Sequence, residues 1–247
     1  MRASIFHLYH SGVAVRSSNN LLVFDYFNDY PAAGKDQSTE AFSGGVIGKK
    51  ELSTPEEVFV FVSHNHGDHY NSIIFEWEEY RPDIKYIISD DIKAFRDSDN
   101  INVVSKDQEI NTGGIRVKTF GSTDKGVSFL VELEGIKIFH AGDLNWWYWD
   151  NFSEEQLAVE EREYKDEIAK IKGENIDIAF VPVDPRLGDY YHLGGDYFIK
   201  EIKPALFVPI HFADNYSITT QYYRRMKKEG TEVAVIKGRG ERIIYDY

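Results

Sequence analysis

The chain has 247 residues, of which 42% are hydrophobic and 15% aromatic, so it can bury a substantial core and suits one domain spanning residues 1–247. It contains no cysteine, which excludes disulfide bonds, thiolate ligands and cysteine nucleophiles. A net charge of −13 disfavours a nucleic-acid partner, and no apolar run approaches the ~18 residues of a spanning helix, so we expect a cytoplasmic protein without a membrane partner.

The N-terminal quarter of the chain is predicted to form three short strands, at residues 3–9, 12–16 and 21–25. A loop follows from about residue 27 to residue 55, and a loop of that length in a compact domain is usually functional or partly disordered. The next segment, Val58–Val62, is continuously apolar. We therefore expect a strand that is buried on both faces.

The most informative segment comes directly after this strand. His64, His66, Asp68 and His69 fall within six residues. Neutral imidazole and carboxylate are the side chains that hold zinc and related divalent ions, and a strand that ends in a tight turn can gather several of them around one point. The cluster therefore predicts a metal site.

The rest of the chain alternates between strands and helices. A helix from Ser72 to Tyr80 should stop before Pro82. A capping box at Ser153 should open a long, charged helix that reaches about Ile171 and forms an exposed helix or a lid. Further helices are expected at residues 195–202 and 218–228. Further strands are expected at residues 86–89, 103–104, 115–120, 127–133, 136–139, 178–181, 206–210, 233–236 and 243–245.

The segment His64-x-His66-x-Asp68-His69 resembles the signature of the metallo-β-lactamase fold superfamily of metal-dependent hydrolases. Asp143, after a strand and a glycine, is similar to the family's bridging aspartate, and His211 to its final histidine ligand. The motifs follow the family's order, and the resemblance covers essentially the whole chain. The opening segments His10-Ser11-Gly12 and Leu22-Val23-Phe24-Asp25 resemble the first hairpin of the lactonase-like branch. The resemblance implies an α/β chain folded as a four-layer αββα sandwich, two sheets with helices outside.

The family resemblance also implies a hydrolytic centre with one or two divalent ions, with zinc as the first expectation and manganese or iron as alternatives. One ion would be held by His64 and His66, a second by Asp68, His69 and His211, and Asp143 would bridge them. A metal-bound hydroxide would attack a small molecule, such as a lactone, an ester or a phosphorylated metabolite. Asp68 or His192 would manage protons as the catalytic residue.

One departure from the family pattern concerns the metal ligands. The family usually supplies another histidine between the first motif and the Gly-Asp element, but no histidine lies between His69 and His140. Ser122 stands near the expected position. Asp124 or a water molecule would then complete the metal shell, or only one ion would bind, or the site would be degenerate.

Several interpretations remain open at this stage. Two alternatives to a small-molecule hydrolase are left open. One is a phosphodiesterase or nuclease of the same superfamily, and the other is a non-catalytic binding protein with a decayed site. His140 is a core or supporting residue or a direct ligand, and His10 is structural or close to the metals. The aromatic run Trp146–Trp149 lines the substrate pocket or plugs the core. Exposed aromatic residues make a homo-oligomer plausible.

Overall fold

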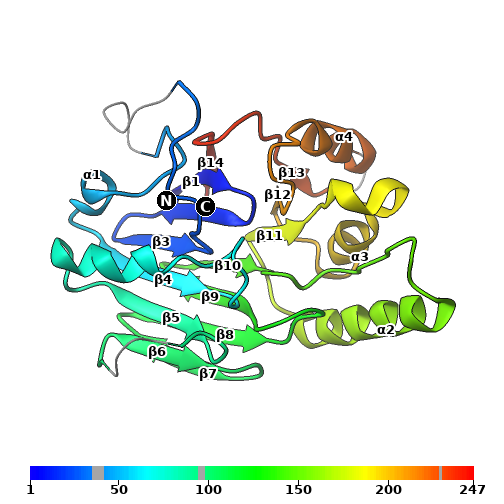
Figure 1. Cartoon of the computed structure of the whole chain (residues 1–247), viewed down its shortest axis with the longest axis horizontal. Coiled ribbons are helices and arrows are strands. Elements are labelled where there is room, and N and C mark those ends of the chain that lie inside the picture. The colour runs from blue at the N-terminus through cyan, green and yellow to red at the C-terminus, as the bar shows by residue number, and fades with distance from the viewer. Residues whose placement is uncertain (35–41, 94–97, 228–229) are drawn as a thin grey trace. The chain divides into compact units, whose positions relative to one another are not determined.

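The computed structural model describes residues 1–34, 42–93, 98–227 and 230–247 (Figure 1). It divides the chain into two compact units, residues 1–104 with 237–247, and residues 105–236. Each unit is built on one seven-stranded sheet that contains both parallel and antiparallel pairs. The expectation of one domain over residues 1–247 stays a prediction. No helix among the described residues is long and apolar enough to cross a membrane.

The sheet of the first unit has the strand order β14-β1-β2-β3-β4-β5-β6, so that the last strand of the chain pairs with the first (Figure 1). Its strands are β1 (Arg2–Tyr9), β2 (Gly12–Arg16), β3 (Asn20–Phe24), β4 (Glu57–Val62), β5 (Lys85–Ser89), β6 (Ile101–Val104) and β14 (Arg242–Asp246), and its helices are α1 (Lys49–Leu52) and the 3₁₀ helix η1 (Ser72–Glu79). Pairs are antiparallel from β14 to β3 and parallel from β3 to β6. Strands β1, β3 and β4 therefore run in the same direction and end at the same edge of the sheet.

Strand β4 lies in the interior of this sheet, between β3 and β5, and is buried as its apolar sequence predicts. Residues Val58–Val62 are at most 1% exposed, and the ring of Phe61 stacks on that of Phe24 in β3 at 4.6 Å between centroids. The helix predicted at residues 72–80 is present as η1, capped by the Asn71 side chain, which accepts a hydrogen bond from the Ile73 N–H. The long loop predicted at about residues 27–55 is described except for residues 35–41.

The sheet of the second unit has the order β13-β12-β11-β10-β9-β8-β7. Its strands are β7 (Glu109–Thr112), β8 (Ile115–Phe120), β9 (Ser128–Leu133), β10 (Ile136–His140), β11 (Ile178–Pro182), β12 (Leu206–Ile210) and β13 (Glu232–Val233), and its helices are α2 (Glu154–Ile171), the 3₁₀ helix η2 (Pro185–Tyr190), α3 (Leu193–Ile202) and α4 (Ser217–Met226). Pairs are antiparallel from β7 to β10 and parallel from β10 to β13. Strands β8, β10, β11 and β12 therefore end at one edge of this sheet.

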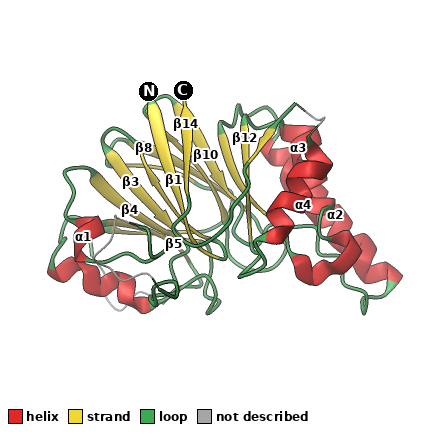
Figure 2. Ribbon diagram, turned by 90° about the horizontal axis from the view of Figure 1, so that it is seen from above, coloured by secondary structure: helices red, strands yellow, loops and turns green. Residues whose placement is uncertain are grey.

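Helices α2, α3 and α4 lie together beside the sheet of their own unit (Figure 2). Helix α2 opens with the predicted capping box, in which the Ser153 hydroxyl accepts from the Gln156 N–H and the Gln156 side chain accepts from the Ser153 N–H. Its inner face is formed by Tyr164, Ile168 and Ile171, all at most 1% exposed. Because this face is buried, α2 is a packed helix whose charges lie on the outer side.

Most predicted strands are confirmed, with differences at a few segments. Strand β7 and the helices α1 and η2 were not predicted, and the loop predicted at residues 27–55 is wrong at α1. The strand predicted at residues 233–236 is wrong beyond Val233, because the Ile236 N–H donates to the Thr219 hydroxyl instead of to a neighbouring strand. Helix α4 extends to Met226 rather than to residue 228, which lies outside the described residues.

Candidate metal centre

The first unit collects its candidate residues at the edge where β1, β3 and β4 end. His10 follows β1, Asp25 follows β3, and the histidine motif follows β4. The backbone φ angles of His10 and Asp25 are +54° and +46°. Residues other than glycine seldom adopt this left-handed backbone conformation, and it is found preferentially at functional sites. The chain therefore turns sharply at His10 and at Asp25, directly after the two strands.

Asp25 is a buried carboxylate that orients two histidines of the motif. It accepts hydrogen bonds from the backbone N–H and the hydroxyl of Ser63, at 2.8 and 2.7 Å, and lies 2.8 Å from Nδ1 of His69. The Ser63 oxygen lies 2.9 Å from Nδ1 of His64. Because the Ser63 proton goes to Asp25, both histidines place their Nδ1 protons in this network and keep Nε2 as the electron-pair donor. Sequence reasoning missed this role of Asp25, although an aspartate directly after an apolar strand was visible.

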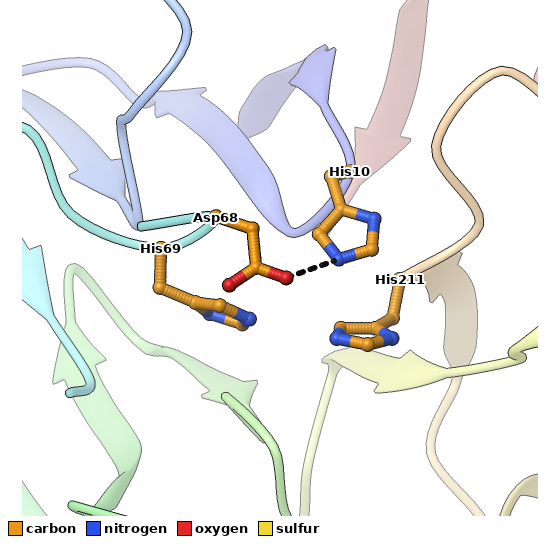
Figure 3. Close-up of side chains that lie close together, drawn as sticks. All are labelled: His10, Asp68, His69 and His211. Carbon is orange, nitrogen blue, oxygen red and sulfur yellow. Dashed lines mark ion pairs between the residues drawn. The ribbon is translucent and has the colours of Figure 1, made fainter. Parts of the chain in front are cut away.

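One group of ligand types in the first unit consists of His10, Asp68 and His69. Their ligand atoms all lie within 4.8 Å of one another, and Nε2 of His10 is 3.5 Å from Oδ2 of Asp68. Figure 3 shows this ion pair, with the His69 ring next to the Asp68 carboxylate. The interaction with His10 is the main cause that holds the pKa of Asp68 well below its usual range. His10, for which a structural role was the alternative, is thus in contact with the motif.

The other two histidines of the motif, His64 and His66, approach each other separately. Nε2 of His64 lies 3.0 Å from Nδ1 of His66. Zinc–nitrogen bonds are about 2.0–2.1 Å long, so two nitrogens at this separation can share one ion. The turn that carries His66 is anchored by a hydrogen bond from the Asn65 N–H to Asp91, at 3.0 Å.

In the second unit, Asp143 follows β10 after a turn that requires glycine. Gly142 has a φ angle of +54°, in the left-handed region. The Gly142 N–H donates to Nδ1 of His140 at 3.1 Å, and His140 is fully buried beside Phe180. His140 therefore supports the turn that presents Asp143, and it lies outside the groups of described residues that could hold a metal.

His211 follows β12 and is held between two carboxylates of the same unit. Its Nε2 lies 3.2 Å from Oδ1 of Asp143, and its Nδ1 lies 3.0 Å from Oδ2 of Asp184, which follows β11. Burial acts to raise the pKa of Asp184, but hydrogen bonds from His211 and Arg186 outweigh it and lower the pKa to about 2. An ionised Asp184 can only accept, so the His211 proton sits on Nδ1 and Nε2 faces Asp143.

Asp184 has two roles in this unit. It caps η2 by accepting a hydrogen bond from the Arg186 N–H at 2.8 Å, and it orients His211. The Arg186 guanidinium also donates to both Asp184 oxygens, and its charged end lies over the ring of Trp149, 5.7 Å from the centroid.

Asp124 lies in the turn after β8, at the same edge of this sheet as Asp143. Its ligand atom is within 4.8 Å of that of Asp143. Ser122, the residue near the expected position of the missing histidine, accepts a hydrogen bond from the Asp124 N–H at 3.2 Å. The sequence had named Asp124 only as one way to complete the shell, and the structure puts its carboxylate beside the expected bridging residue.

The aromatic run after Asp143 divides between the candidate ligands and helix α2, and its role in lining a substrate pocket stays a prediction. Trp147 is 6% exposed, donates its indole N–H to the Asp143 carbonyl, and packs edge-on against His211 at 5.5 Å. Trp149 lies parallel to Trp147 at 5.8 Å and is half-buried. Trp146 faces the helices, under Lys165 and next to Tyr164. One part of the run therefore borders the candidate ligands, and another packs against α2.

His192, the second predicted catalytic residue, does not belong to either group of potential ligands among the described residues. It stands at the N-terminus of α3, and its Nδ1 lies 2.8 Å from Oδ2 of Asp196, one turn further along. Arg225 from α4 donates to the same carboxylate. Gly194 packs so closely on Asn145 that an added Cβ would lie 2.1 Å from its Oδ1. The start of α3 is thus in contact with the segment that follows Asp143.

Each unit presents side chains of the kinds that hold divalent ions. The sets contain only imidazole nitrogens and carboxylate oxygens, which are the donors of hydrolytic zinc, manganese and iron sites. Nδ1 of His69 and Nδ1 of His211 each lie against a buried carboxylate, as is usual for histidines that bind metal. The first unit offers His10, His64, His66, Asp68 and His69, and the second offers Asp124, Asp143 and His211.

Comparisons with known proteins bear on the fold and the family. No protein-family model matches the chain. A UPF0173 metal-dependent hydrolase of Staphylococcus saprophyticus is 25% identical over 234 residues, which cover 84% of this chain and 92% of the relative. Among solved structures, the metallo hydrolase Igni18 of Ignicoccus hospitalis superposes with a TM-score of 0.65 at 14% identity, covering 100% of both chains. The metallo-β-lactamase fold protein YhfI of Bacillus subtilis superposes with a TM-score of 0.62 at 13% identity, covering 99% of this chain and 100% of the other.

The similarity to these structures shows that the chain has the metallo-β-lactamase fold, the αββα sandwich expected from the sequence. The two mixed sheets and their helices agree with it. The description of the staphylococcal relative agrees with the metal-dependent hydrolase expected from the motifs. None of the three descriptions mentions a lactone, so the lactonase-like branch stays a prediction.

Proposed function

We propose that this protein is a metal-dependent hydrolase of a small molecule. The observation that carries the proposal is the placing of oriented histidines and carboxylates at the strand ends of both sheets, in the order of the metallo-β-lactamase signature. The relative from Staphylococcus saprophyticus, which is described as a metal-dependent hydrolase, supports it. A decayed site would not need to keep the buried Asp25 and Asp184, which orient histidines.

We assign the metal ligands as the motifs indicate. His64 and His66 would hold one ion, and Asp143 would be shared with a second. Asp68, His69 and His211 would hold that second ion, and the contact of His10 with Asp68 adds His10 to the same proposed set. A two-ion centre uses all of these residues, whereas a one-ion centre would leave half of them without a purpose.

When divalent ions are bound, they supply an activated water and polarise the carbonyl or phosphoryl oxygen of the substrate. The chain's own residues prepare that chemistry. Asp25 and Asp184 keep the Nδ1 protons of His69 and His211 in place, so that Nε2 stays available. Trp147 shields the Asp143 backbone from water by covering its carbonyl. The result is a rigid set of donors that needs little rearrangement when substrate binds.

The catalytic proton transfer is assigned to Asp68 or His192, and the residues favour different steps. Asp68 has a lowered pKa, so it is ionised at neutral pH and suits the acceptance of a proton or the holding of an ion. The contact of His192 Nδ1 with Asp196 leaves Nε2 to exchange a proton with a leaving group. We therefore assign leaving-group protonation to His192.

The substrate is proposed to be a lactone, an ester or a phosphorylated metabolite. The half-buried Trp149 and the exposed Arg186 next to it are suited to contact such a molecule. The net charge of −13 disfavours the alternative of a nuclease or phosphodiesterase that acts on nucleic acid. Zinc is the first candidate ion, followed by manganese and iron, and homo-oligomeric assembly remains part of the proposal.

Elemental analysis of protein purified without chelator tests the proposal, with His66→Ala, Asp143→Asn and His192→Ala as variants. We expect about two equivalents of metal in the wild type, with losses in the first two variants. Asp166→Asn, an exposed aspartate on α2, is the control for the loss of one charge. His192→Ala should keep its metal and lose turnover of lactone and phosphoester substrates.

Absence of bound metal after reconstitution with zinc, manganese or iron would refute the catalytic reading and favour a binding protein with a degenerate site. Metal binding without turnover of any lactone, ester or phosphoester would refute the proposed substrate class but leave the metal centre standing. Equal metal contents in wild type and Asp143→Asn would show that the assigned ligands are wrong.

A further inference from the structure

The first coordination shell implied by the motifs is short of one ligand. The family pattern expects a histidine after the strand that corresponds to β8, and residues 70–139 contain none. The turn after β8 instead carries Ser122, Thr123 and Asp124. Ser122 and Thr123 offer only neutral hydroxyls, which are not among the usual ligands of such ions, and the Thr123 hydroxyl is bonded to the backbone of the Asp143 segment.

The topology of the second sheet explains why Asp124 meets Asp143. Strands β8 and β10 are both antiparallel to β9, which lies between them, so they run in the same direction. Their following turns therefore emerge at the same edge. The ligand atoms of the two aspartates lie within 4.8 Å of each other. Two bonds of about 2.0–2.2 Å to one ion require a separation of at most about 4.4 Å, so a small adjustment of the Asp124 side chain suffices at the upper end of this range.

Thr123 fixes this arrangement from one side. Its hydroxyl donates to the Asn145 carbonyl at 2.6 Å and to the Asp143 carbonyl at 3.3 Å, and it accepts from the Asn145 N–H at 3.0 Å. The turn after β8 is thus attached to the backbone that presents the bridging aspartate. A substitution that keeps the backbone of Asp124 should leave this attachment intact.

Gly121 fixes the turn from the other side. Its N–H donates to the Glu167 carboxylate at 3.0 Å, and an added Cβ would lie 2.7 Å from the same side chain. The turn is therefore clamped between α2 and the Asp143 segment. The clamped turn fixes the backbone of Asp124, so that only its exposed side chain has to be ordered when an ion binds.

We propose that Asp124 is the metal ligand that replaces the missing histidine, so that the ion shared with Asp143 is held by more oxygen donors than the family pattern has. The inference rests on the proposed function, because it takes Asp143 as a ligand. Carboxylate oxygen suits manganese, whereas imidazole suits zinc. Replacing histidine by aspartate shifts the preference of this ion site from zinc towards manganese, relative to a site with the histidine.

The test is calorimetric titration of chelator-treated, full-length protein with Mn²⁺ and with Zn²⁺. The variants are Asp124→Asn, which removes the charge, and Asp124→His, which restores the family's ligand, with Asp166→Asn as the matched control. We expect Asp124→Asn to weaken one ion by roughly 100-fold or more while the other ion still binds, because a lost ligand costs at least as much as a lost supporting contact. Asp124→His should regain that ion and raise the ratio of zinc to manganese affinity by about tenfold or more.

The outcomes separate this inference from the proposed function. If the wild type binds metal and both Asp124 variants bind like Asp166→Asn, then Asp124 is not a ligand and the proposed function stands. If the wild type binds neither ion, the proposed function fails and the inference fails with it. Circular dichroism establishes that each variant is folded, and if Asp124→Asn is not, the zinc-to-manganese ratio of Asp124→His against wild type decides alone.

Discussion

At the scale of single residues, the candidate centre depends on side chains that bind no metal themselves. Each of His69 and His211 has its Nδ1 against a buried carboxylate, Asp25 and Asp184. Such a partner fixes the tautomer and the ring orientation of a histidine and strengthens it as a ligand. Both carboxylates follow a strand that is parallel and adjacent to the strand of their histidine. The same device therefore occurs once in each unit.

Replacing Asp184 by Asn should weaken metal binding without removing a ligand. The amide keeps the size of the carboxylate but loses the charge that holds the Nδ1 proton of His211 in place. We expect a 10- to 100-fold rise in the dissociation constant of an ion, the usual effect of removing such a partner. Titration of the chelator-treated variant with Zn²⁺ measures it, with Asp166→Asn as the control. An unchanged constant would show that Asp184 serves only to cap η2.

Glu160 on α2 should make stability depend on pH. Burial, with help from Glu163 and Asp124, raises the pKa of Glu160 to about 7, and its Oε2 makes no hydrogen bond among the residues that the structure describes. In the unfolded chain this carboxyl ionises near pH 4.5. Between pH 4.5 and 7 the folded state therefore binds the extra proton, so the contribution of Glu160 to stability falls as the pH rises through this range.

The substitution Glu160→Gln removes the loss of stability that ionisation of Glu160 causes at high pH. We expect the variant to be more stable than the wild type at pH 8 by about 1 kcal/mol, a value reduced for the partial exposure of the side chain, and to gain little at pH 4. Urea denaturation of chelator-treated protein at both pH values measures the difference. The same gain at both pH values would mean that packing, rather than titration, is responsible.

At the scale of secondary-structure elements, the two sheets place every candidate metal ligand in a turn that follows a strand. In the first unit these are the ends of β1, β3 and β4, and in the second those of β8, β10, β11 and β12. Ligands of α/β proteins characteristically bind at the carboxyl ends of parallel strands, where several turns emerge together. Helix α3 follows the same logic, since its first turn packs against the segment after Asp143.

Gly194→Ala should separate α3 from that segment. The added Cβ would lie 2.1 Å from Oδ1 of Asn145 and 3.2 Å from the Trp146 nitrogen, and the second of these atoms is backbone. We expect a loss of about 1–3 kcal/mol in the free energy of unfolding, as for other overpacked sites, together with reduced turnover. Gly238→Ala is the control, because its Cβ would meet nothing within 4 Å. Equal stability of the two variants would show that Asn145 moves aside freely.

The elements also show where prediction from the sequence stopped. The strand Val58–Val62 and the histidines after it were predictable, because apolar run and ligand spacing are both local signals. The contact of Asp25 with His69 was not, because the two residues are 44 positions apart and meet only through the register in which Phe24 pairs with Phe61. The short β7 alternates exposed and half-buried residues with little apolar content, which gives no local signal. The local sequence pattern therefore predicts the candidate ligands, whereas the carboxylates that orient them are identified only from the pairing of the strands.

At the scale of the whole molecule, the protein combines an excess of negative charge with candidate sites for cations. The net charge is −13, and several buried or half-buried carboxylates, among them Asp25, Asp143 and Asp184, stand at the sheet edges. Bound divalent ions would reduce that charge locally. The folded state should therefore be more stable with its ions than without them, since the unfolded chain cannot assemble the sites.

Removal of metal should lower the melting temperature. An ion present at 100 times its dissociation constant stabilises the folded state by about 2.7 kcal/mol, and for a chain of this size each kcal/mol corresponds to roughly 2–4 °C. We expect a chelator to lower the melting temperature of the wild type by about 5–10 °C, measured by calorimetry, and re-addition of Zn²⁺ or Mn²⁺ to restore it. His66→Ala and Asp143→Asn should respond less, and Asp166→Asn as the wild type does. A chelator effect of equal size in all four proteins would place the stabilising ion somewhere other than the assigned ligands.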